Sequence, residues 1–332
     1  MNSVEGSAEF PLLETLPPFL EGRTAEFERQ TLRYRVLPGS PPLLLVDEAP
    51  LEGYPSISSM GEMDLKELQL LDELRRVPSL VVAYSGGVDS AYLAHAAHKA
   101  LGDRMLAVTA LSASYSERDR REAERCVELA KFPHEFITTD ELSDPNYRAN
   151  NPDRCYFCKD ELFNKLDELV EQRGYAAVAY GVNLDDLGDW RPGQRAAREH
   201  QVLTPLVDAG LTKADIRELA RRAGLPVWDR PASACLSSRI AYGIDVTPER
   251  LAIVEKGEEA VRALGFRQFR VRYHEKLVRL EIAPEELARA FTREMARKFV
   301  EIFKPLGFTY VTLDLEGYRQ GSLNTHLINL KS

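Results

Sequence analysis

Long hydrophobic runs and an export signal are both missing from this 332-residue sequence. Its apolar stretches fall short of the roughly 18 residues that a membrane span requires. Residues 1–10 contain acidic side chains and lack the basic-then-apolar order of a secretory signal. These absences predict a cytoplasmic protein. Basic charge is also scarce, since 43 Lys and Arg face 52 Asp and Glu for a net charge of −9, which argues against charge-driven binding to nucleic acid.

Cysteine is rare as well, with four residues in the chain. So few thiols without an export signal exclude the disulfide framework of small secreted proteins and indicate buried thiols, metal ligands or catalysts. Cys126 shares one side of a predicted helix with Ala123, Val127 and Ala130, so we expect it to be a small buried side chain. The other three cysteines have different surroundings.

The length predicts about two domains, and the pattern along the chain gives their boundaries. Prolines break up residues 1–60, which we interpret as an N-terminal extension of unknown role with a strand or two. Residues 61–240 alternate buried-strand runs with helical periodicity. The predicted strands cover 80–84, 105–109, 135–138 and 176–180, and the predicted helices cover 64–76, 91–101, 117–131, 159–172 and 212–223. This order predicts an α/β domain with a parallel sheet between helices.

Residues 241–332 have a different character and predict a smaller α+β domain for substrate binding or oligomerisation. A helix is expected from Thr247-Pro248 to about Leu264, with threonine as N-cap and proline at the first helical position. Paired strands are expected at 268–273 and 277–282, then helices near 284–303 and a strand at 309–313.

Ser85–Ser90 reads Ser-Gly-Gly-Val-Asp-Ser between a predicted buried strand and a helix. Gly86 and Gly87 allow a sharp turn and a close backbone approach, and the helix N–H groups then favour an anion. Ser85 and Ser90 can donate to phosphate oxygens, and Asp89 can cap the helix or hold magnesium. An ordinary Gly-Gly turn with a serine cap is the plainer alternative. The GxxxxGK[ST] loop is excluded, because no lysine is present here.

A second acidic segment follows the predicted strand at 176–180. Asp185 and Asp186 stand where a parallel sheet places its ligands, so they are candidates to orient a nucleotide or magnesium, with a solvated loop as the alternative. Arg191 is a candidate anion partner, because a guanidinium group pairs bidentately with phosphate or carboxylate.

Three cysteines form the second candidate centre. Cys155 and Cys158 make a CxxC motif at the start of a helix, and Cys235 lies far along the chain. A redox pair, a zinc site and an iron–sulfur cluster held by three thiolates all remain open, although zinc usually takes four ligands and no histidine stands at matching spacing.

Charged residues of the C-terminal part are candidates for binding an anionic substrate. Arg270 and Arg272 alternate along a predicted strand and so share one face, and Arg239 follows the third cysteine as a further anion partner. The alternative is a solvated strand face. Glu258 alone has the pattern of a surface residue.

The Ser-Gly-Gly-x-Asp-Ser loop resembles the signature of the PP-loop ATP pyrophosphatase superfamily, whose domains are adenine nucleotide alpha hydrolase-like. Several further motifs resemble the LarE-type ATP-dependent sulfurtransferases, which act on pyridinium-3,5-biscarboxylic acid mononucleotide. The resemblance runs from about residue 64 to about residue 290. It is carried by Ser85–Ser90, Asn150–Lys159 (NNPDRCYFCK), Gly181–Asp186, Arg191–Gly193, Pro231–Arg239 (PASACLSSR) and Phe269–His274 (FRVRYH).

The resemblance implies that ATP with magnesium adenylates a substrate carboxylate and that sulfur then displaces AMP, during assembly of the nickel-pincer nucleotide. The three cysteines imply sulfur delivery through a 4Fe–4S cluster from sulfide or another donor, whereas relatives with one cysteine sacrifice its sulfur. The resemblance also implies a homo-oligomer. By motif, the nucleotide-binding residues are Ser85, Gly86, Gly87, Asp89, Ser90, Asp185, Asp186 and Arg191. The substrate-binding residues are Arg239, Glu258, Arg270 and Arg272.

Other functions compete with this one. Enzymes of tRNA 2-thiolation also join a PP-loop to paired cysteines, but the acidic balance of charge speaks against them. A glutamine-fuelled synthetase needs a glutaminase domain that this sequence lacks, although a separate polypeptide could supply it. A non-catalytic module that binds a nucleotide or a metal is the remaining alternative.

Overall fold

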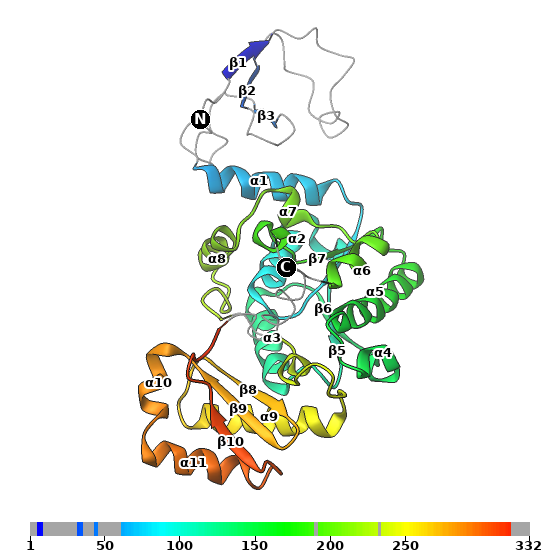
Figure 1. Ribbon diagram of the computed structural model, residues 1–332. Coiled ribbons are helices and arrows are strands. Elements are labelled where there is room, and N and C mark those ends of the chain that lie inside the picture. The colour runs from blue at the N-terminus through cyan, green and yellow to red at the C-terminus, as the bar shows by residue number, and fades with distance from the viewer. Residues whose placement is uncertain are drawn as a thin grey trace, which may run out of the picture. The chain divides into compact units, whose positions relative to one another are not determined.

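The computed structural model describes residues 61–188, 192–231 and 234–319, together with the backbone of three short strands within residues 1–60 (Figure 1). The chain divides into two compact units, Met1–Gln69 and Leu70–Ser332. In the first, β1 (Glu5–Ala8), β2 (Leu32–Arg35) and β3 (Leu43–Leu45) form an antiparallel sheet in the order β1-β2-β3. The rest of the predicted N-terminal extension lies outside the described residues. Helix α1 (Glu62–Arg75) follows.

A four-stranded parallel sheet forms the centre of the second unit and confirms the predicted α/β class. Its strands are β4 (Leu80–Ala83), β5 (Met105–Leu111), β6 (His134–Thr138) and β7 (Ala177–Tyr180), in the order β6-β5-β4-β7. Every neighbouring pair is parallel, and Val81 in the centre aligns with Leu106 on one side and Val178 on the other. All four residues of β4 are buried, because helices cover both faces of the sheet.

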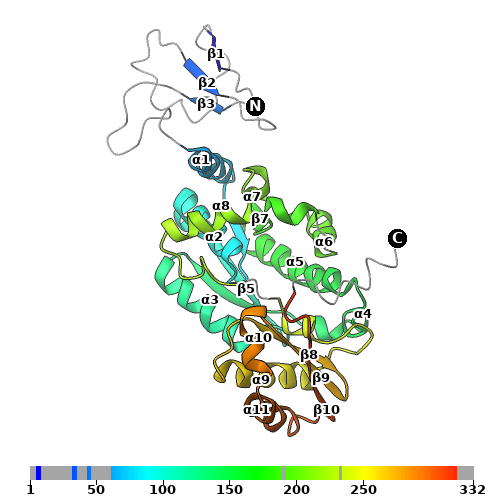
Figure 2. The same ribbon diagram turned by 60° about the vertical axis from the view of Figure 1, so that its left-hand side comes forward.

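The covering helices lie close to where the apolar periodicity predicts them. They are α2 (Val88–Leu101), α3 (Glu117–Ala130), α5 (Arg154–Arg173) and α8 (Lys213–Arg222). Figure 2 shows α2 and α3 on one side of the sheet and α5 on the other. Helix α5 begins at Arg154 instead of the predicted residue 159, so the CxxC motif lies inside its first turns. Three short helices were not predicted, because one or two turns show no periodicity: α4 (Pro145–Arg148), α6 (Gly193–Glu199) and α7 (Pro205–Asp208).

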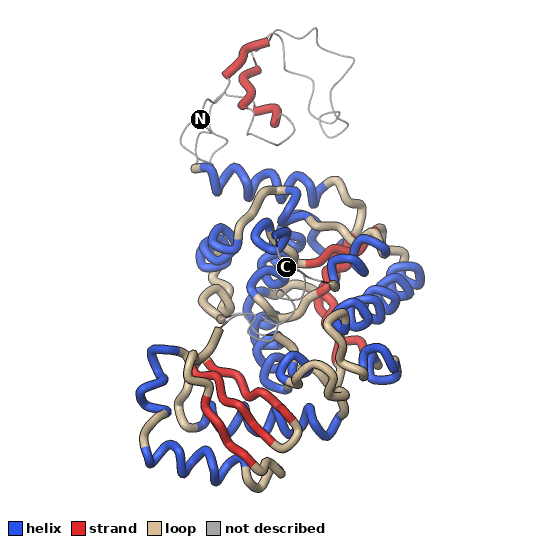
Figure 3. Tube along the Cα trace, in the orientation of Figure 1, coloured by secondary structure: helices blue, strands red, loops and turns tan. Residues whose placement is uncertain are grey.

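The C-terminal elements form a second sheet with helices packed against it (Figure 3). The elements are α9 (Pro248–Ala263), β8 (Phe269–His274), β9 (Leu277–Ile282), α10 (Pro284–Ala290), α11 (Arg293–Phe303) and β10 (Tyr310–Leu313). Strands β8 and β9 pair antiparallel as predicted, and β10 joins β9 in parallel. Phe266, Phe299 and Phe303 fill the core of this region. The α+β character is therefore as expected, while a domain boundary near residue 240 stays a prediction.

None of the helices in the described part of the chain combines the length and the apolar composition that a membrane span requires.

Candidate active site

The loop between β4 and α2 folds back on itself through its two serines. The Ser85 amide donates to Ser90 Oγ at 3.1 Å, and Ser90 Oγ donates to the Gly87 carbonyl at 3.1 Å. Gly86 has φ +76°, and a Cβ on it would lie 2.9 Å from the Cβ of Ala123. Only glycine meets both the backbone and the steric requirement here. The loop thus ends at the first turn of α2, where backbone N–H groups favour an anion.

Asp89 of this loop is held by two residues from other elements. Its Oδ1 accepts a hydrogen bond from Asn183 Nδ2 at 3.3 Å, and its Oδ2 forms an ion pair with Lys213. Lys213 is the first residue of α8, which a Thr212–Asp215 capping box fixes in place. Sequence reasoning missed Lys213 and Asn183 as site residues. The capping box signals a helix start, but no local pattern shows that this start faces the loop.

The predicted acidic pair lies beside this group but is engaged in local structure. Asp185 Oδ2 accepts from the Lys213 amide at 2.8 Å, and Asp186 Oδ2 accepts from the Asn183 amide at 3.2 Å. Gly181 brings this segment against the first turn of α2, because a Cβ on Gly181 would lie 2.6 Å from the Ser90 nitrogen. The two carboxylates therefore stabilise the edge of the anion-binding cradle, which consists of the Ser85–Ser90 loop and the first turn of α2. Arg191 lies outside the described residues.

Two segments far apart in sequence bring the three candidate cysteines together. Buried Asn150 donates to the carbonyls of Ala241 and Ile244, each at 2.9 Å. Arg154, also buried, donates to Asn150 and, at 2.8 Å, to the Ser237 carbonyl. These bonds fasten the start of α5 to the chain that follows Cys235.

The thiols of the two segments affect one another electrostatically. Burial raises the pKa of Cys158, and Glu141, Cys235 and Cys155 raise it further. The pKa of Cys155 is also raised, by the surrounding protein and then by Cys235, while the Arg154 guanidinium opposes the change. Cys155 nevertheless keeps contact with solvent. The structure therefore gathers both segments of the predicted centre in one place.

These thiols do not converge on one point. Among the residues that the structure describes, no three His, Cys, Asp or Glu side chains are placed to hold a single metal ion. A mononuclear zinc site in this part of the chain therefore finds no support. Cys126 is fully buried in α3, and burial raises the pKa of its thiol, which confirms the prediction of a small core side chain.

Ser114 and Tyr115, which follow β5, contact both the Ser85–Ser90 loop and the loop that bears Cys235. The hydroxyl of Tyr115, just after β5, donates to the Ser85 carbonyl at 3.2 Å. The neighbouring Ser114 carbonyl accepts from the Leu236 amide at 3.0 Å. Arg230 adds a second link, since it donates to the Gly86 carbonyl at 3.3 Å. The cradle and the loop that bears Cys235 are therefore connected through Ser114, Tyr115 and Arg230.

Arg239 and Glu258 form a bidentate ion pair next to Cys235. Arg239 Nε lies 2.8 Å from Glu258 Oε1 and Nη2 lies 3.2 Å from Oε2, while Nη1 donates to the Cys235 carbonyl at 2.9 Å. The side chain of Glu258 is only 13% exposed. The alternative view of Glu258 as a surface residue is therefore wrong.

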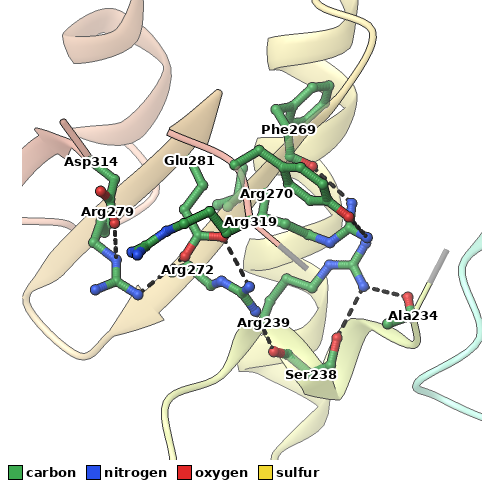
Figure 4. A network of polar contacts seen from close by, with 12 residues as sticks. Ala234, Ser238, Arg239, Phe269, Arg270, Arg272, Arg279, Glu281, Asp314 and Arg319 are labelled. Atoms are coloured by element: carbon green, nitrogen blue, oxygen red, sulfur yellow. Dashed lines mark hydrogen bonds and ion pairs between the residues drawn. The ribbon is translucent and has the colours of Figure 1, made fainter. Parts of the chain in front are cut away.

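Arg270 and Arg272 extend this charged group along β8 (Figure 4). Arg272 donates to the Ser238 carbonyl at 2.8 Å and to Glu281 at 2.9 Å, and its side chain is 7% exposed. Arg270 donates to the Tyr318 hydroxyl at 3.3 Å, and burial followed by Arg239 lowers its pKa. The alternative of a solvated strand face is wrong for Arg272, which instead supports the Cys235 loop.

A cleft that is open to solvent lies beside these residues. Its lining comes from α3, α9, β8 and the segments on either side of Cys235. The described arginines that line it are Arg118, Arg230, Arg239, Arg262, Arg267 and Arg270. The acids that line it are Asp119, Glu255, Glu258 and Glu259. Because the guanidinium groups outnumber these carboxylates, the cleft suits a small anionic ligand.

A parallel α/β sheet with a Ser-Gly-Gly cradle at the end of its central strand defines the class as a PP-loop ATP pyrophosphatase. In agreement, the chain is 28% identical over 211 residues to one component of the glutamine-hydrolyzing GMP synthase of Thermococcus kodakarensis, covering 56% of this chain and 66% of that protein. The match to the pyridinium-3,5-bisthiocarboxylic acid mononucleotide synthase of Lactiplantibacillus plantarum is 34% over 271 residues, covering 81% and 97%. The chain belongs to that family, the LarE enzymes.

An uncharacterized protein of Synechocystis is 42% identical over 266 residues, covering 80% of this chain and 98% of its own length. No family model matches the chain.

Proposed function

We propose that the protein is an ATP-dependent sulfurtransferase that converts a carboxylate of pyridinium-3,5-biscarboxylic acid mononucleotide into a thiocarboxylate, in the synthesis of a nickel-pincer nucleotide. Family membership supports the substrate. The observation that carries the chemistry is that Ser114–Tyr115 and Arg230 join the nucleotide cradle to the loop that bears Cys235. An acyl group activated in the cradle would then be within reach of sulfur.

The first half of the reaction activates the carboxylate. A carboxylate oxygen attacks the α-phosphorus of ATP, the bond to the β-phosphate oxygen breaks, and pyrophosphate leaves. Ser85, Gly86, Gly87 and Ser90 would bind phosphate oxygens through amides and hydroxyls. Asp89 would hold the magnesium ion that accompanies ATP, and Lys213 beside it would offset the charge of the leaving pyrophosphate.

The second half transfers sulfur. A sulfide attacks the acyl carbon, the bond to the AMP oxygen breaks, and a thiocarboxylate remains. The substrate would lie in the arginine-lined cleft, with Arg239 and Glu258 beside Cys235 and with Arg270 and Arg272 behind them. Arg239 and Arg270, which line the cleft, would bind the anionic substrate, while Glu258 and Arg272 would hold Arg239 and the Cys235 loop in place, so that the acyl carbon faces the thiols.

Cys155, Cys158 and Cys235 would be the ligands of a 4Fe–4S cluster, each thiolate binding a different iron, since the hydrogen bond from Arg154 to the Ser237 carbonyl holds their two segments together. When bound, such a cluster would supply an iron with an open position for sulfide. The chain itself would supply the three thiolates. Because burial raises the pKa of Cys155 and Arg154 only partly opposes that rise, iron would have to displace a proton from this thiol when it binds.

Protein purified without oxygen tests this proposal. We expect iron and acid-labile sulfide, pyrophosphate release only when the pyridinium dicarboxylate is present, and many thiocarboxylates per chain when sulfide is supplied. Cys235→Ala should abolish thiocarboxylate formation and lower the iron content, whereas Cys126→Ala in α3 should retain both.

Two outcomes would contradict parts of the proposal. At most one thiocarboxylate per chain, with loss of sulfur from Cys235, would show a sacrificial mechanism. Release of pyrophosphate that does not depend on the pyridinium compound would show another substrate.

A further inference from the structure

Arg262 lies on the cleft without a carboxylate of its own. It belongs to the last turn of α9 and is half-buried, with its guanidinium 4.9 Å from the ring centroid of Phe269. In the described part of the chain no ion pair joins Arg262 to an acidic side chain. A half-buried cation at the edge of a cleft is costly unless an anion accompanies it.

Charges of both signs surround Arg262. Burial lowers the pKa of Arg262, and the guanidinium of Arg118 lowers it further, while Glu258, Glu122 and Asp119 act in the opposite direction.

Each of those three acids already has a cation. Glu258 is paired with Arg239, Asp119 with Arg230, and Glu122 with Arg118 at 2.7 Å. Glu122 also pairs with Arg230 at 2.8 Å. Two further acids of the cleft wall have other partners, since Glu255 accepts from the Glu117 amide and Glu259 pairs with Arg121. None of these five acids therefore forms an ion pair with Arg262 in the described part of the chain. This arrangement is typical of a site that completes its charge with a bound anion.

We infer that Arg262 binds an anionic group of the mononucleotide other than the carboxylate that reacts, an inference that rests on the proposed function. Residues 258 and 262 are four apart on α9 and so lie on one face of the helix. The Arg239–Glu258 pair, next to Cys235, faces the reacting carboxylate. Arg262 lies one turn further along the same wall, where a second anionic group of the bound substrate falls.

The 5′-phosphate and the second ring carboxylate offer the same chemistry to a guanidinium group. Steady-state kinetics with three substrates distinguishes them: the full mononucleotide, its dephosphorylated nucleoside and nicotinic acid mononucleotide, which has one carboxylate. For Arg262→Gln we expect KM for the full mononucleotide to rise about 10- to 100-fold, as for loss of a charge-assisted bond, with KM for ATP unchanged. Arg262→Lys should recover part of the loss.

The effect of Arg262→Gln should vanish for the substrate that lacks the bound group. Loss of the effect with the nucleoside assigns the phosphate, and loss with nicotinic acid mononucleotide assigns the second carboxylate. Arg293→Gln removes the same charge from an exposed position on α11 and should leave every KM unchanged.

An unchanged KM in Arg262→Gln, or the same rise for all three substrates, would overturn the inference and leave the proposed function intact. Wild-type protein that thiolates none of the three would overturn both. Circular dichroism of each variant verifies the fold, and Arg262→Lys provides the kinetic comparison if Arg262→Gln does not fold.

Discussion

The ion pair between Lys213 and Asp89 brings a positive charge to a loop whose own sequence contains none. Its two partners come from the first turns of α8 and α2. In Lys213→Met, Asp89 would keep its negative charge beside the phosphates of ATP without a compensating cation. We expect KM for ATP to rise about tenfold or more and pyrophosphate release to slow, measured with saturating pyridinium substrate.

Lys276→Met is the matched control, because Lys276 is exposed and follows β8, away from the cradle. It should behave as the wild type. A Lys213→Met enzyme with an unchanged KM for ATP would show that the ion pair serves only the packing of α8.

Lys213 also shows where residue-level prediction from sequence ends. Ser85–Ser90 could be identified because its chemistry lies within six consecutive residues. Lys213 reaches Asp89 across 124 residues of chain, and only the folded sheet brings those helix starts together. Glu258 could not be interpreted from the sequence for the same reason, because the pattern of its helix does not reveal its ion pair with Arg239.

At the scale of elements, the start of α5 depends on Asn150. This residue has φ +53° and is fully buried, and its side chain donates to three carbonyls of residues 240–244. Asn150→Ala would leave those carbonyls without this donor and place alanine in the left-handed region. We expect a loss of about 2–4 kcal/mol in the free energy of unfolding, measured by urea denaturation.

Asn150→Gly separates the two causes, because glycine accepts the backbone angle but restores no hydrogen bond. It should recover part of the stability and none of the iron content. Asn164→Ala, at an exposed position of α5, should change the free energy of unfolding by less than about 0.5 kcal/mol. Equal stability of Asn150→Ala and the wild type would contradict this role for the Asn150 side chain.

The elements themselves were largely predictable, because continuous apolar runs mark buried strands and a period of 3.6 marks helices. The start of α5 was not. In its first turn Arg154 donates to the Ser237 carbonyl and Phe157 packs against the cluster that contains Leu236, whereas Tyr156 packs against the core of the main sheet. Because the turn contacts two different regions, its residues show no simple apolar periodicity. The three candidate cysteines lie at the contact between this turn and the Cys235 segment. The spacing of the CxxC motif alone could not decide between a redox pair, a zinc site and an iron–sulfur cluster.

At the scale of the whole molecule, a net charge of −9 coexists with a cleft rich in arginine. Several of these guanidinium groups form ion pairs with acidic side chains or are largely buried. Arg230 and Arg239 have side chains only 11% and 4% exposed and are ion-paired. A small anion can enter such a cleft, whereas the phosphates of a folded RNA need an exposed basic surface.

This difference separates the proposed function from tRNA 2-thiolation. In a filter-binding titration from 50 to 200 mM salt, we expect no binding of unfractionated tRNA at micromolar protein and no steep dependence on salt. In the same protein, the pyridinium mononucleotide should be thiolated at an unchanged rate when excess tRNA is present, because tRNA does not reach the cleft. Micromolar tRNA binding that falls by about a thousandfold or more across that salt range, with competition against the mononucleotide, would instead require a phosphate-binding surface outside the recessed arginines and would favour an RNA substrate.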